Sequence, residues 1–260
     1  MALIDTHAHL DFPKFNKDRL EVIANSWDKG LTYIVNVGAD LLSSRRSIVL
    51  AEEYPFIFAT VGIHPHDASD LDEDALKELK KMASHEKVLA IGEIGLDYHY
   101  DNSPRDIQQE AFRKQLQLAK NLKLPIAIHS READEDTLKI LKEEYPGIKG
   151  GIMHCFASNL AIAKECLDLG LYLAFGGVIT FKNAKELRDV VKEVPLNRIL
   201  LETDSPYLTP EPFRGQRNEP SHVRFIAEKI AKIKEIDLIE VVETTTANAI
   251  EVYKLPEILQ

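Results

Sequence analysis

Two histidines separated by a single alanine, His7 and His9, come directly after an apolar segment at the start of the chain. Because side chains alternate between the two faces of a strand, both imidazoles are predicted to point the same way. Two neutral imidazoles on one face can bind one metal ion with little conformational freedom left to lose. The alternative is a pair of polar residues where a strand meets a loop, and the remaining sequence decides between the two.

Further His, Glu and Asp residues follow other apolar segments, and six of the nine histidines occupy such ends. The candidate metal ligands are His7, His9, Glu93, His129, His154 and Asp204. This set is too large for one tetrahedral ion, and it suits two ions that share a carboxylate. Glu93 is the predicted bridge because its segment lies in the middle of the series. Two such ions can bind both oxygens of an in-line displacement and generate hydroxide at neutral pH. Mixed nitrogen and oxygen ligands suit Zn²⁺ or Mn²⁺ and tolerate others such as Mg²⁺, so the identity of the metal stays open.

Eight apolar, β-branched segments are predicted to be the strands that place these side chains. They are Ala2–Asp5, Thr32–Val37, Ile57–Ile63, Val88–Ile91, Pro125–Ile128, Lys149–Met153, Leu171–Phe175 and Arg198–Leu201. Their nearly continuous hydrophobicity is typical of parallel strands that are buried on both faces. Helical patterns lie between them, and the eight strand–helix units predict an α/β fold of the (β/α)₈ TIM-barrel type. A doubly wound open sheet is the alternative, because the same alternation allows it.

Several details of the helices are also predicted. Leu20, Ile23, Ala24 and Trp27 are spaced as the buried stripe of one helix. Pro104 is expected at the first position of the longest helix. An extra C-terminal helix, roughly Leu238–Tyr253, is expected to pack on the outside of the barrel. No linker or low-complexity tract divides the chain, so residues 1–260 are predicted to form a single domain.

The composition limits the partners. Of the 260 residues, 32 are Lys or Arg and 42 are Asp or Glu, so the formal charge of −10 argues against extensive duplex binding. Cys155 and Cys166 form no disulfide framework. The sequence shows no signal peptide and no apolar run long enough for a membrane span. We therefore predict a cytoplasmic protein with no membrane partner.

The motifs together resemble the TatD family of metal-dependent deoxyribonucleases, which are amidohydrolase-like TIM barrels. The matching segments span essentially the whole chain in order: 5–9 (DTHAH), 62–66 (GIHPH), 92–98 (GEIGLDY), 125–131 (PIAIHSR), 154–156 (HCF), 202–208 (ETDSPYL) and 245–249 (TTANA). The resemblance implies an activity, a substrate and a division of the ligands. The activity is hydrolysis of phosphodiester bonds from DNA ends, of the 3′-to-5′ exonuclease type, and the partner is a DNA end, preferably single-stranded. A monomer is favoured.

The family also implies individual roles. His7, His9, Glu93 and Asp204 would hold one ion, and Glu93, His129 and His154 would hold the other. Asp204 would double as the base that orients or deprotonates the attacking water, and His64 would contact the phosphate.

Other residues near the predicted mouth are candidates for substrate contact. Arg131, Arg214 and Arg217 are cations in loops of an otherwise acidic chain, although ordinary surface loops carry arginines too. Glu202 precedes Asp204 by two positions, so it could contact substrate or orient a ligand histidine. Cys155, next to His154, is expected to face away from the ions into the core.

Two other functions remain open from the sequence. The same centre could cleave an ester or amide, for example as a D-aminoacyl-tRNA deacylase. A non-catalytic metal-binding scaffold is the weakest alternative, because a structural site is closed by its ligands and needs no open mouth.

Overall fold

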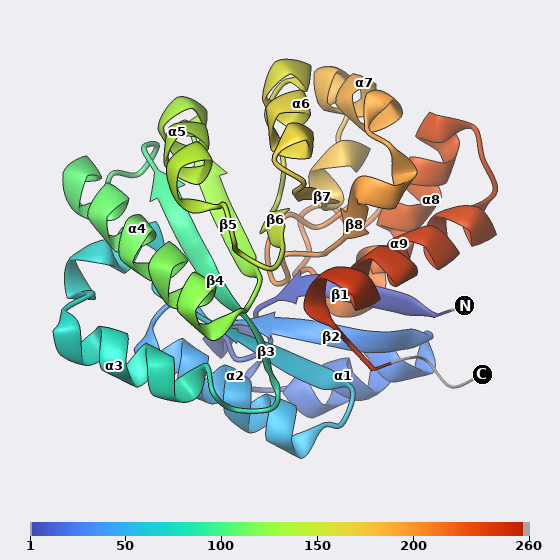
Figure 1. Ribbon diagram of the computed structural model, residues 1–260. Helices are drawn as coiled ribbons and strands as arrows, with labels where there is room; N and C mark the ends of the chain where they lie inside the picture. Colours follow the sequence, from blue (N-terminus) through green and yellow to red (C-terminus); the bar gives the residue numbers. More distant parts are fainter. Residues whose placement is uncertain (1, 257–260) are drawn as a thin grey trace.

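The computed structural model describes residues 2–256, in which strands and helices alternate along the chain (Figure 1). The strands are β1 (Leu3–Ala8), β2 (Leu31–Val37), β3 (Ile57–Val61), β4 (Val88–Asp97), β5 (Ile126–Arg131), β6 (Gly151–Met153), β7 (Tyr172–Phe175) and β8 (Ile199–Leu201). The α-helices are α1 (Arg19–Asp28), α2 (Leu41–Glu53), α3 (Glu73–Met82), α4 (Arg105–Leu122), α5 (Asp134–Glu144), α6 (Leu160–Asp168), α7 (Lys185–Glu193), α8 (Val223–Lys234) and α9 (Leu238–Tyr253). Short 3₁₀ helices are η1 (Pro13–Phe15), η2 (Pro65–Asp70), η3 (Gly177–Thr180), η4 (Leu196–Arg198) and η5 (Pro220–His222).

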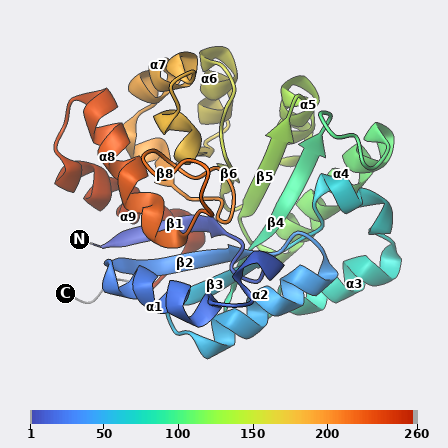
Figure 2. The same ribbon diagram turned by 180° about the vertical axis from the view of Figure 1, so that it is seen from behind.

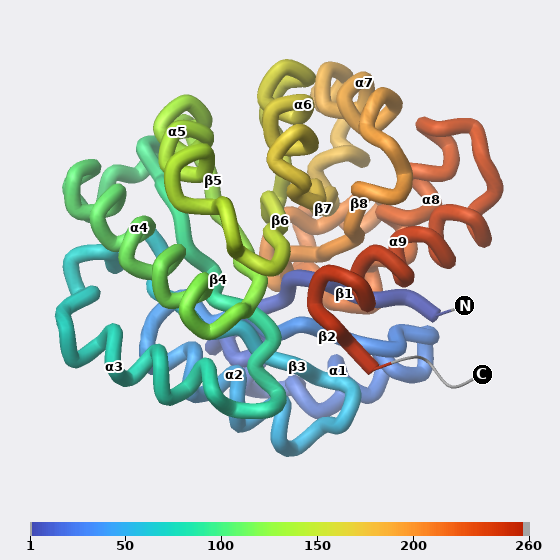
Figure 3. The backbone as a smooth tube through the Cα atoms, in the orientation of Figure 1, coloured from blue at the N-terminus to red at the C-terminus, as the bar shows by residue number. Residues whose placement is uncertain are grey.

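The eight strands form one parallel sheet in chain order, and its two edges meet. A parallel bridge joins Ala8, the last residue of β1, to Ser205, which lies beyond the end of β8. The His9 amide donates to the Ser205 carbonyl (2.8 Å), and the Asp204 amide donates to the His7 carbonyl (2.9 Å). These bonds close the ring, so the TIM barrel is confirmed and the open-sheet alternative is wrong. The tube drawing shows the helices around the outside of the strands (Figure 3).

The barrel has two apolar cores. One lies between the strands and the surrounding helices, and the other fills the barrel interior with side chains such as Val35, Ala90 and Leu200. The extra C-terminal helix is present, and it packs against the end of the barrel at which the strands begin. Residues of α9, including Val252 and Tyr253, belong to the interior core. A barrel interior needs a cover at the end opposite the strand C-termini, and the aromatic and branched side chains of α9 supply it.

α9 is also tied to the barrel by hydrogen bonds. Asn248 donates to the carbonyls of Leu196 (2.9 Å) and Ile199 (2.8 Å), and the Tyr253 hydroxyl donates to the carbonyl of Thr6 (3.3 Å). Within residues 2–256, no helix combines the length and the apolar character that a membrane span requires.

Three local predictions need correction. β4 runs to Asp97 rather than ending at Ile91, because its second half pairs with β5 from Ile94 onward. In α1, Leu20 and Trp27 are 65% and 53% exposed, and the buried face is formed by neighbours that include Ser26. A serine can be buried there because its hydroxyl donates to the Val22 carbonyl (2.7 Å). Pro104 is the N-cap of α4 rather than its first residue.

Candidate metal centre

Glu93 lies at the centre of the cluster formed by the six predicted ligands, and its side chain is 6% exposed. Its two carboxylate oxygens face different histidines. Oε2 lies 3.5 Å from Nε2 of His7 and 3.8 Å from Nε2 of His9. Oε1 lies 2.9 Å from Nδ1 of His129 and 3.6 Å from Nε2 of His154. The two oxygens of one carboxylate therefore contact different imidazoles, while the rings of His7 and His154 stack on one another with their centroids 3.4 Å apart.

Asp204 approaches two of these imidazoles from β8. Its Oδ1 lies 3.5 Å from Nε2 of His9 and 4.0 Å from Nε2 of His154. The backbone of Asp204 is in the left-handed region (φ 56°), which is unusual for a residue with a side chain. Hydrogen bonds hold it there on both sides, because its amide donates to His7 and its carbonyl accepts from the Tyr207 amide (2.8 Å). Such a sparsely populated backbone conformation is typical of a functional position.

In His9, His129 and His154, the ring nitrogen that faces away from Glu93 is held by a neighbouring group. His9 Nδ1 lies 3.0 Å from the Val37 carbonyl, which can only accept, so in the neutral ring Nδ1 carries the proton and Nε2 has the lone pair. Nδ1 of His154 lies 3.0 Å from the Glu202 carboxylate, and Nε2 of His129 lies 3.2 Å from Asp97. This arrangement, in which a carboxylate or carbonyl orients an imidazole, is typical of histidines that bind metal ions.

The electrostatics of the cluster match a site for cations. Burial opposes protonation of His9 and His154, but the carboxylates around them outweigh it. The pKa of His9 is raised to about 9, mainly by Asp204, and that of His154 to about 10, mainly by Glu202 and Glu93. Burial would raise the pKa of Glu93, yet the surrounding histidines hold it well below its usual range. Carboxylates that stay ionised among convergent imidazoles form a donor set that fits divalent metal ions.

His64 lies beside this cluster but differs from the other imidazoles. Its Nδ1 accepts a hydrogen bond from the backbone amide of His66 (3.2 Å), and its Nε2 lies 3.6 Å from Oε1 of Glu93. Burial lowers the pKa of His64 well below its ordinary value, so the ring is neutral. Because Nδ1 is an acceptor, the ring proton is on Nε2. His64 therefore presents a donor toward the centre, and this ring stays neutral beside histidines whose pKa is raised.

Two of the residues predicted to contact substrate, Glu202 and Arg217, instead bind other residues of the chain. Glu202 is fully buried, where its carboxylate holds the His154 ring and accepts from the Cys155 amide (2.6 Å). Of the two roles considered for Glu202, this position fits orienting a ligand histidine rather than contacting substrate. Arg217 donates to Asp18 (2.7 Å) and to Glu219 (3.1 Å), so its charge is already neutralised within the chain.

Arg131 and Arg214 remain available. Arg131 ends β5 and is exposed, with its guanidinium 4.8 Å from the centroid of the Tyr100 ring. Arg214 is exposed in the loop after β8 and lies 3.7 Å from the centroid of the Phe181 ring. Within residues 2–256, neither guanidinium forms an ion pair with a carboxylate.

Sequence reasoning missed Asp97 and misplaced Cys155. Asp97 is 1% exposed and lies 2.9 Å from His66 and 3.2 Å from His129. It follows Glu93 by four positions on the same strand, and that even spacing would have found it. Cys155 does not continue β6, because its φ of 46° turns the chain, and the rule of alternating faces fails there. Its thiol lies with donor atoms of His154 and Asp204 rather than in the core.

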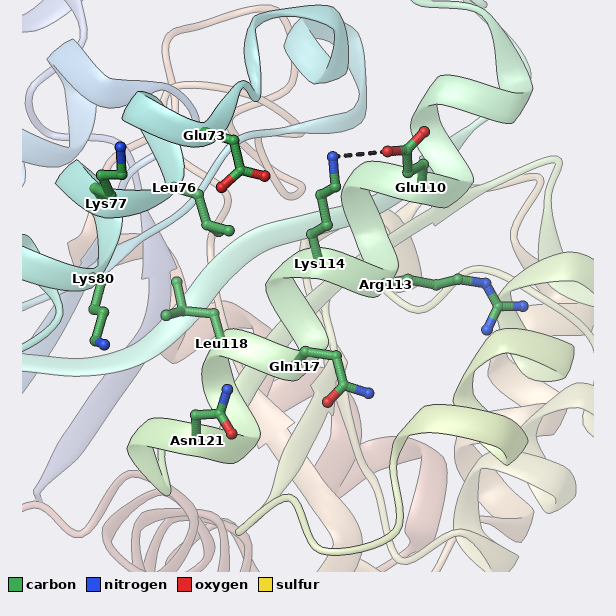
Figure 4. Close-up of a pocket in the computed structure, with 10 residues that line it drawn as sticks. All are labelled: Glu73, Leu76, Lys77, Lys80, Glu110, Arg113, Lys114, Gln117, Leu118 and Asn121. Carbon is green, nitrogen blue, oxygen red and sulfur yellow. Dashed lines mark ion pairs between the residues drawn. The ribbon is translucent and has the colours of Figure 1, made fainter.

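A cavity of about 290 Å³ adjoins the centre and is lined by Ser130, Arg131, His154 and Ser158, among others. A larger groove of about 440 Å³ lies between α3 and α4 (Figure 4). Leu76 and Leu118 contribute to its wall, and Lys114 pairs with Glu110 across 2.7 Å. None of the described residues that line this groove is a histidine, and Lys77, Arg113 and Lys114 pair with carboxylates of neighbouring residues, so the centre at the strand ends is the candidate site.

The known proteins that resemble this chain match it over nearly its whole length. The family profile described as TatD related DNase matches residues 4–254. YabD of Bacillus subtilis (strain 168), an uncharacterised metal-dependent hydrolase, is 51% identical over 253 residues, which cover 97% of this chain and 99% of YabD. The 3′-5′ ssDNA/RNA exonuclease TatD of Erwinia tasmaniensis is 33% identical, with 97% and 100% covered. The crystal structure of YJJV, a TatD homologue from Escherichia coli K12, superposes with a TM-score of 0.92 at 30% identity over 98% of each chain.

Proposed function

The chain belongs to the TatD-related DNase family and is a metal-dependent hydrolase, and from that premise we propose that it hydrolyses DNA phosphodiester bonds from strand ends in the 3′-to-5′ direction. The observation that carries the proposal is that the two carboxylate oxygens of Glu93 contact different imidazoles. A carboxylate placed in this way would be able to hold two ions, and two-metal centres are typical of phosphodiester hydrolysis. Single-stranded ends are the preferred substrate, since a chain with a formal charge of −10 repels long duplexes.

In the proposed centre, Glu93, His7, His9 and Asp204 would hold one divalent ion, and Glu93, His129 and His154 would hold the other. When bound, the ions supply Lewis acidity at the phosphoryl oxygens and acidify the attacking water. The donor set accepts Mg²⁺, Mn²⁺ or Zn²⁺. Asp97, Glu202 and the Val37 carbonyl orient the histidines, so the rings are preorganised before any ion binds.

The chain's own groups then act on the substrate. The Nε2–H of His64 donates to a non-bridging oxygen of the scissile phosphate, where negative charge develops. Asp204 orients the attacking water and accepts its proton. Burial raises the pKa of Asp204, but the hydrogen bond from His9 and the charges of His154 and His9 outweigh it, so the net pKa is lowered and the side chain is ionised and ready to act as a base. Arg131 and Arg214 are the cations that contact flanking phosphates.

A direct assay tests this proposal. Metal-stripped protein is incubated with 5′-labelled single-stranded DNA, a circular single strand and an aminoacyl ester, and Mg²⁺, Mn²⁺ or Zn²⁺ is added back in turn. We expect a ladder of products shortened from the 3′ end, with the circle resistant. Glu93→Gln should abolish turnover and lower the metal content, whereas Glu110→Gln, a surface residue paired with Lys114, should have no effect.

The other outcomes separate the alternatives. Cleavage of the circle would show that no free end is required. Hydrolysis of the ester without any DNA cleavage would favour a deacylase. Full activity of Glu93→Gln with normal metal content would exclude the bridging role.

A further inference from the structure

Two tyrosines near the centre are exposed, and their rings make edge-on aromatic contacts within the chain, Tyr100 with His66 and Tyr207 with Phe12. Tyr100 is 55% exposed and Tyr207 is 39% exposed. Neither hydroxyl forms a hydrogen bond with any residue between 2 and 256. Single exposed aromatic residues are common on protein surfaces, so exposure alone means little. Their positions relative to the centre and to nearby cations distinguish these two.

The two rings lie on opposite sides of the candidate site. Tyr100 follows β4 and Tyr207 follows β8, and these strands are four places apart in a closed ring of eight (Figure 2). The backbone amide of Tyr100 donates to Asp97 (2.9 Å), and its ring centroid lies 5.3 Å from that of His66. The backbone amide of Tyr207 donates to the carbonyl of Asp204. Each tyrosine is thus attached to a residue of the centre, Tyr100 to Asp97 and Tyr207 to Asp204.

Each ring is paired with a cation. The guanidinium of Arg131 lies 4.8 Å from the centroid of Tyr100, and the ammonium of Lys14 lies 4.7 Å from the centroid of Tyr207. Within residues 2–256, neither Arg131 nor Lys14 forms an ion pair with a carboxylate. An aromatic face beside an unpaired cation complements a nucleotide, which offers a base to stack and a phosphate to neutralise. Two such pairs flank the centre of a chain that is acidic overall.

We propose that Tyr100 and Tyr207 are stacking platforms for the bases of a single strand on either side of the scissile phosphate, an inference that rests on the proposed nuclease function. A base in a duplex is already stacked and paired, so only unpaired ends can use both platforms. The two tyrosines therefore determine the preference for single-stranded ends. Because every base has a π face, this recognition is tolerant of sequence.

The test compares Tyr100→Leu and Tyr207→Leu with Tyr100→Phe and Tyr207→Phe. The Phe variants keep the ring and lose only a hydroxyl that bonds to no described residue. Trp27→Leu, at an exposed aromatic on α1, serves as a remote control. Circular dichroism and thermal unfolding establish that each variant is folded. KM and kcat are measured on single-stranded oligonucleotides, and on the same strands with an abasic terminal or penultimate nucleotide. Fluorescence anisotropy with a labelled single strand and Ca²⁺ gives the dissociation constant without relying on turnover.

We expect each Leu variant to raise KM and the dissociation constant about tenfold, while kcat changes little. The Phe variants and Trp27→Leu should match the wild type. On a substrate that is abasic at the nucleotide which the tyrosine stacks, wild type and Leu variant should become equal. The stacking role would be overturned if KM were unchanged in both folded Leu variants. It would also be overturned if the tenfold increase in KM persisted on both abasic substrates. Either result would leave the nuclease function intact. Failure of the wild type to cleave any oligonucleotide with any metal would overturn the nuclease function and this inference with it.

Discussion

Asp204 shows how a single residue combines position and charge. Its φ of 56° is maintained by hydrogen bonds from its amide and to its carbonyl, and its carboxylate stays ionised beside His9. The carboxylate is therefore fixed in direction and available to accept a proton. In contrast, the neighbouring Glu202 is fully buried and acts through His154 as a positioning residue. Two acidic residues two positions apart thus have different tasks, because one faces the mouth and the other faces the ring that it orients.

Asp204→Asn is predicted to lower kcat by about 10²–10⁴, because asparagine keeps the shape but cannot accept a proton from water. The ion proposed for Glu93, His129 and His154 should be retained. Steady-state kinetics at saturating Mn²⁺ and metal analysis measure both effects. Asp101→Asn, the same substitution at an exposed carboxylate paired with Arg105, is the matched control and should keep the wild-type rate. Wild-type kcat in Asp204→Asn would remove this residue from the role of base.

At the level of elements, the pairing of β4 with β5 sets the distance between Glu93 and His129. Gly95 lies two residues after Glu93 and is paired with His129 across the sheet. Its φ is +143°, and a Cβ placed on it would lie 1.9 Å from the His129 carbonyl oxygen. A side chain at this position would force the two strands apart where both contribute to the centre. The glycine therefore permits the close approach of the strands.

Gly95→Ala is predicted to lower the free energy of unfolding by about 3 kcal/mol or more, through overpacking and backbone strain together. Metal affinity should fall as well, because His129 is displaced. Gly170→Ala provides the comparison: its φ is +82°, but a Cβ there meets nothing within 4 Å. That variant should lose only about 1 kcal/mol. Chemical denaturation of both proteins measures the difference, and equal losses would contradict a specific role for the contact between strands.

At the scale of the whole molecule, the buried cluster of histidines and carboxylates makes the free energy of unfolding depend on pH and on metal binding. Without metal, the pKa of His9 is about 9 and that of His154 about 10, above the ordinary value of about 6.5. A group with a raised pKa stabilises the folded chain fully below pH 6.5, and this contribution is lost as the pH rises toward 9–10. Metal ions bind the neutral rings, so they compete with these protons.

The stabilisation by Mn²⁺ is therefore predicted to grow with pH. Between pH 6 and pH 8.5, each proton that the ion displaces adds about 1.4 kcal/mol per pH unit to the apparent binding free energy. The increase in Tm on adding Mn²⁺ should be several degrees larger at pH 8.5 than at pH 6. Thermal unfolding of metal-stripped and Mn²⁺-loaded protein at both pH values measures this. His154→Ala should reduce the dependence on pH, and a metal-induced shift that is independent of pH would exclude the competition.

Much of the barrel and of the candidate site was predictable from the sequence, for a local reason. Strand ends carry their polar residues within a few positions of an apolar run, so the pairing of His7 with His9 and the placement of Glu93 and Asp204 are visible in short segments. The repeated alternation of strands and helices then brings all the strand ends to one mouth. The order of the motifs along the chain and the barrel fold follow from these short-range patterns.

Long-range contacts were not predictable in the same way. Three such contacts join residues that are far apart in the sequence. The histidines divide between the two oxygens of Glu93, Glu202 holds the His154 ring, and Asp18 neutralises Arg217. Closure of the barrel sets these distances, and residues near the mouth have several partners of suitable charge within reach. The position of Tyr100 opposite Tyr207 likewise depends on which strands lie across the ring. Local periodicity indicates which face a side chain occupies, whereas packing of the closed barrel selects its partner.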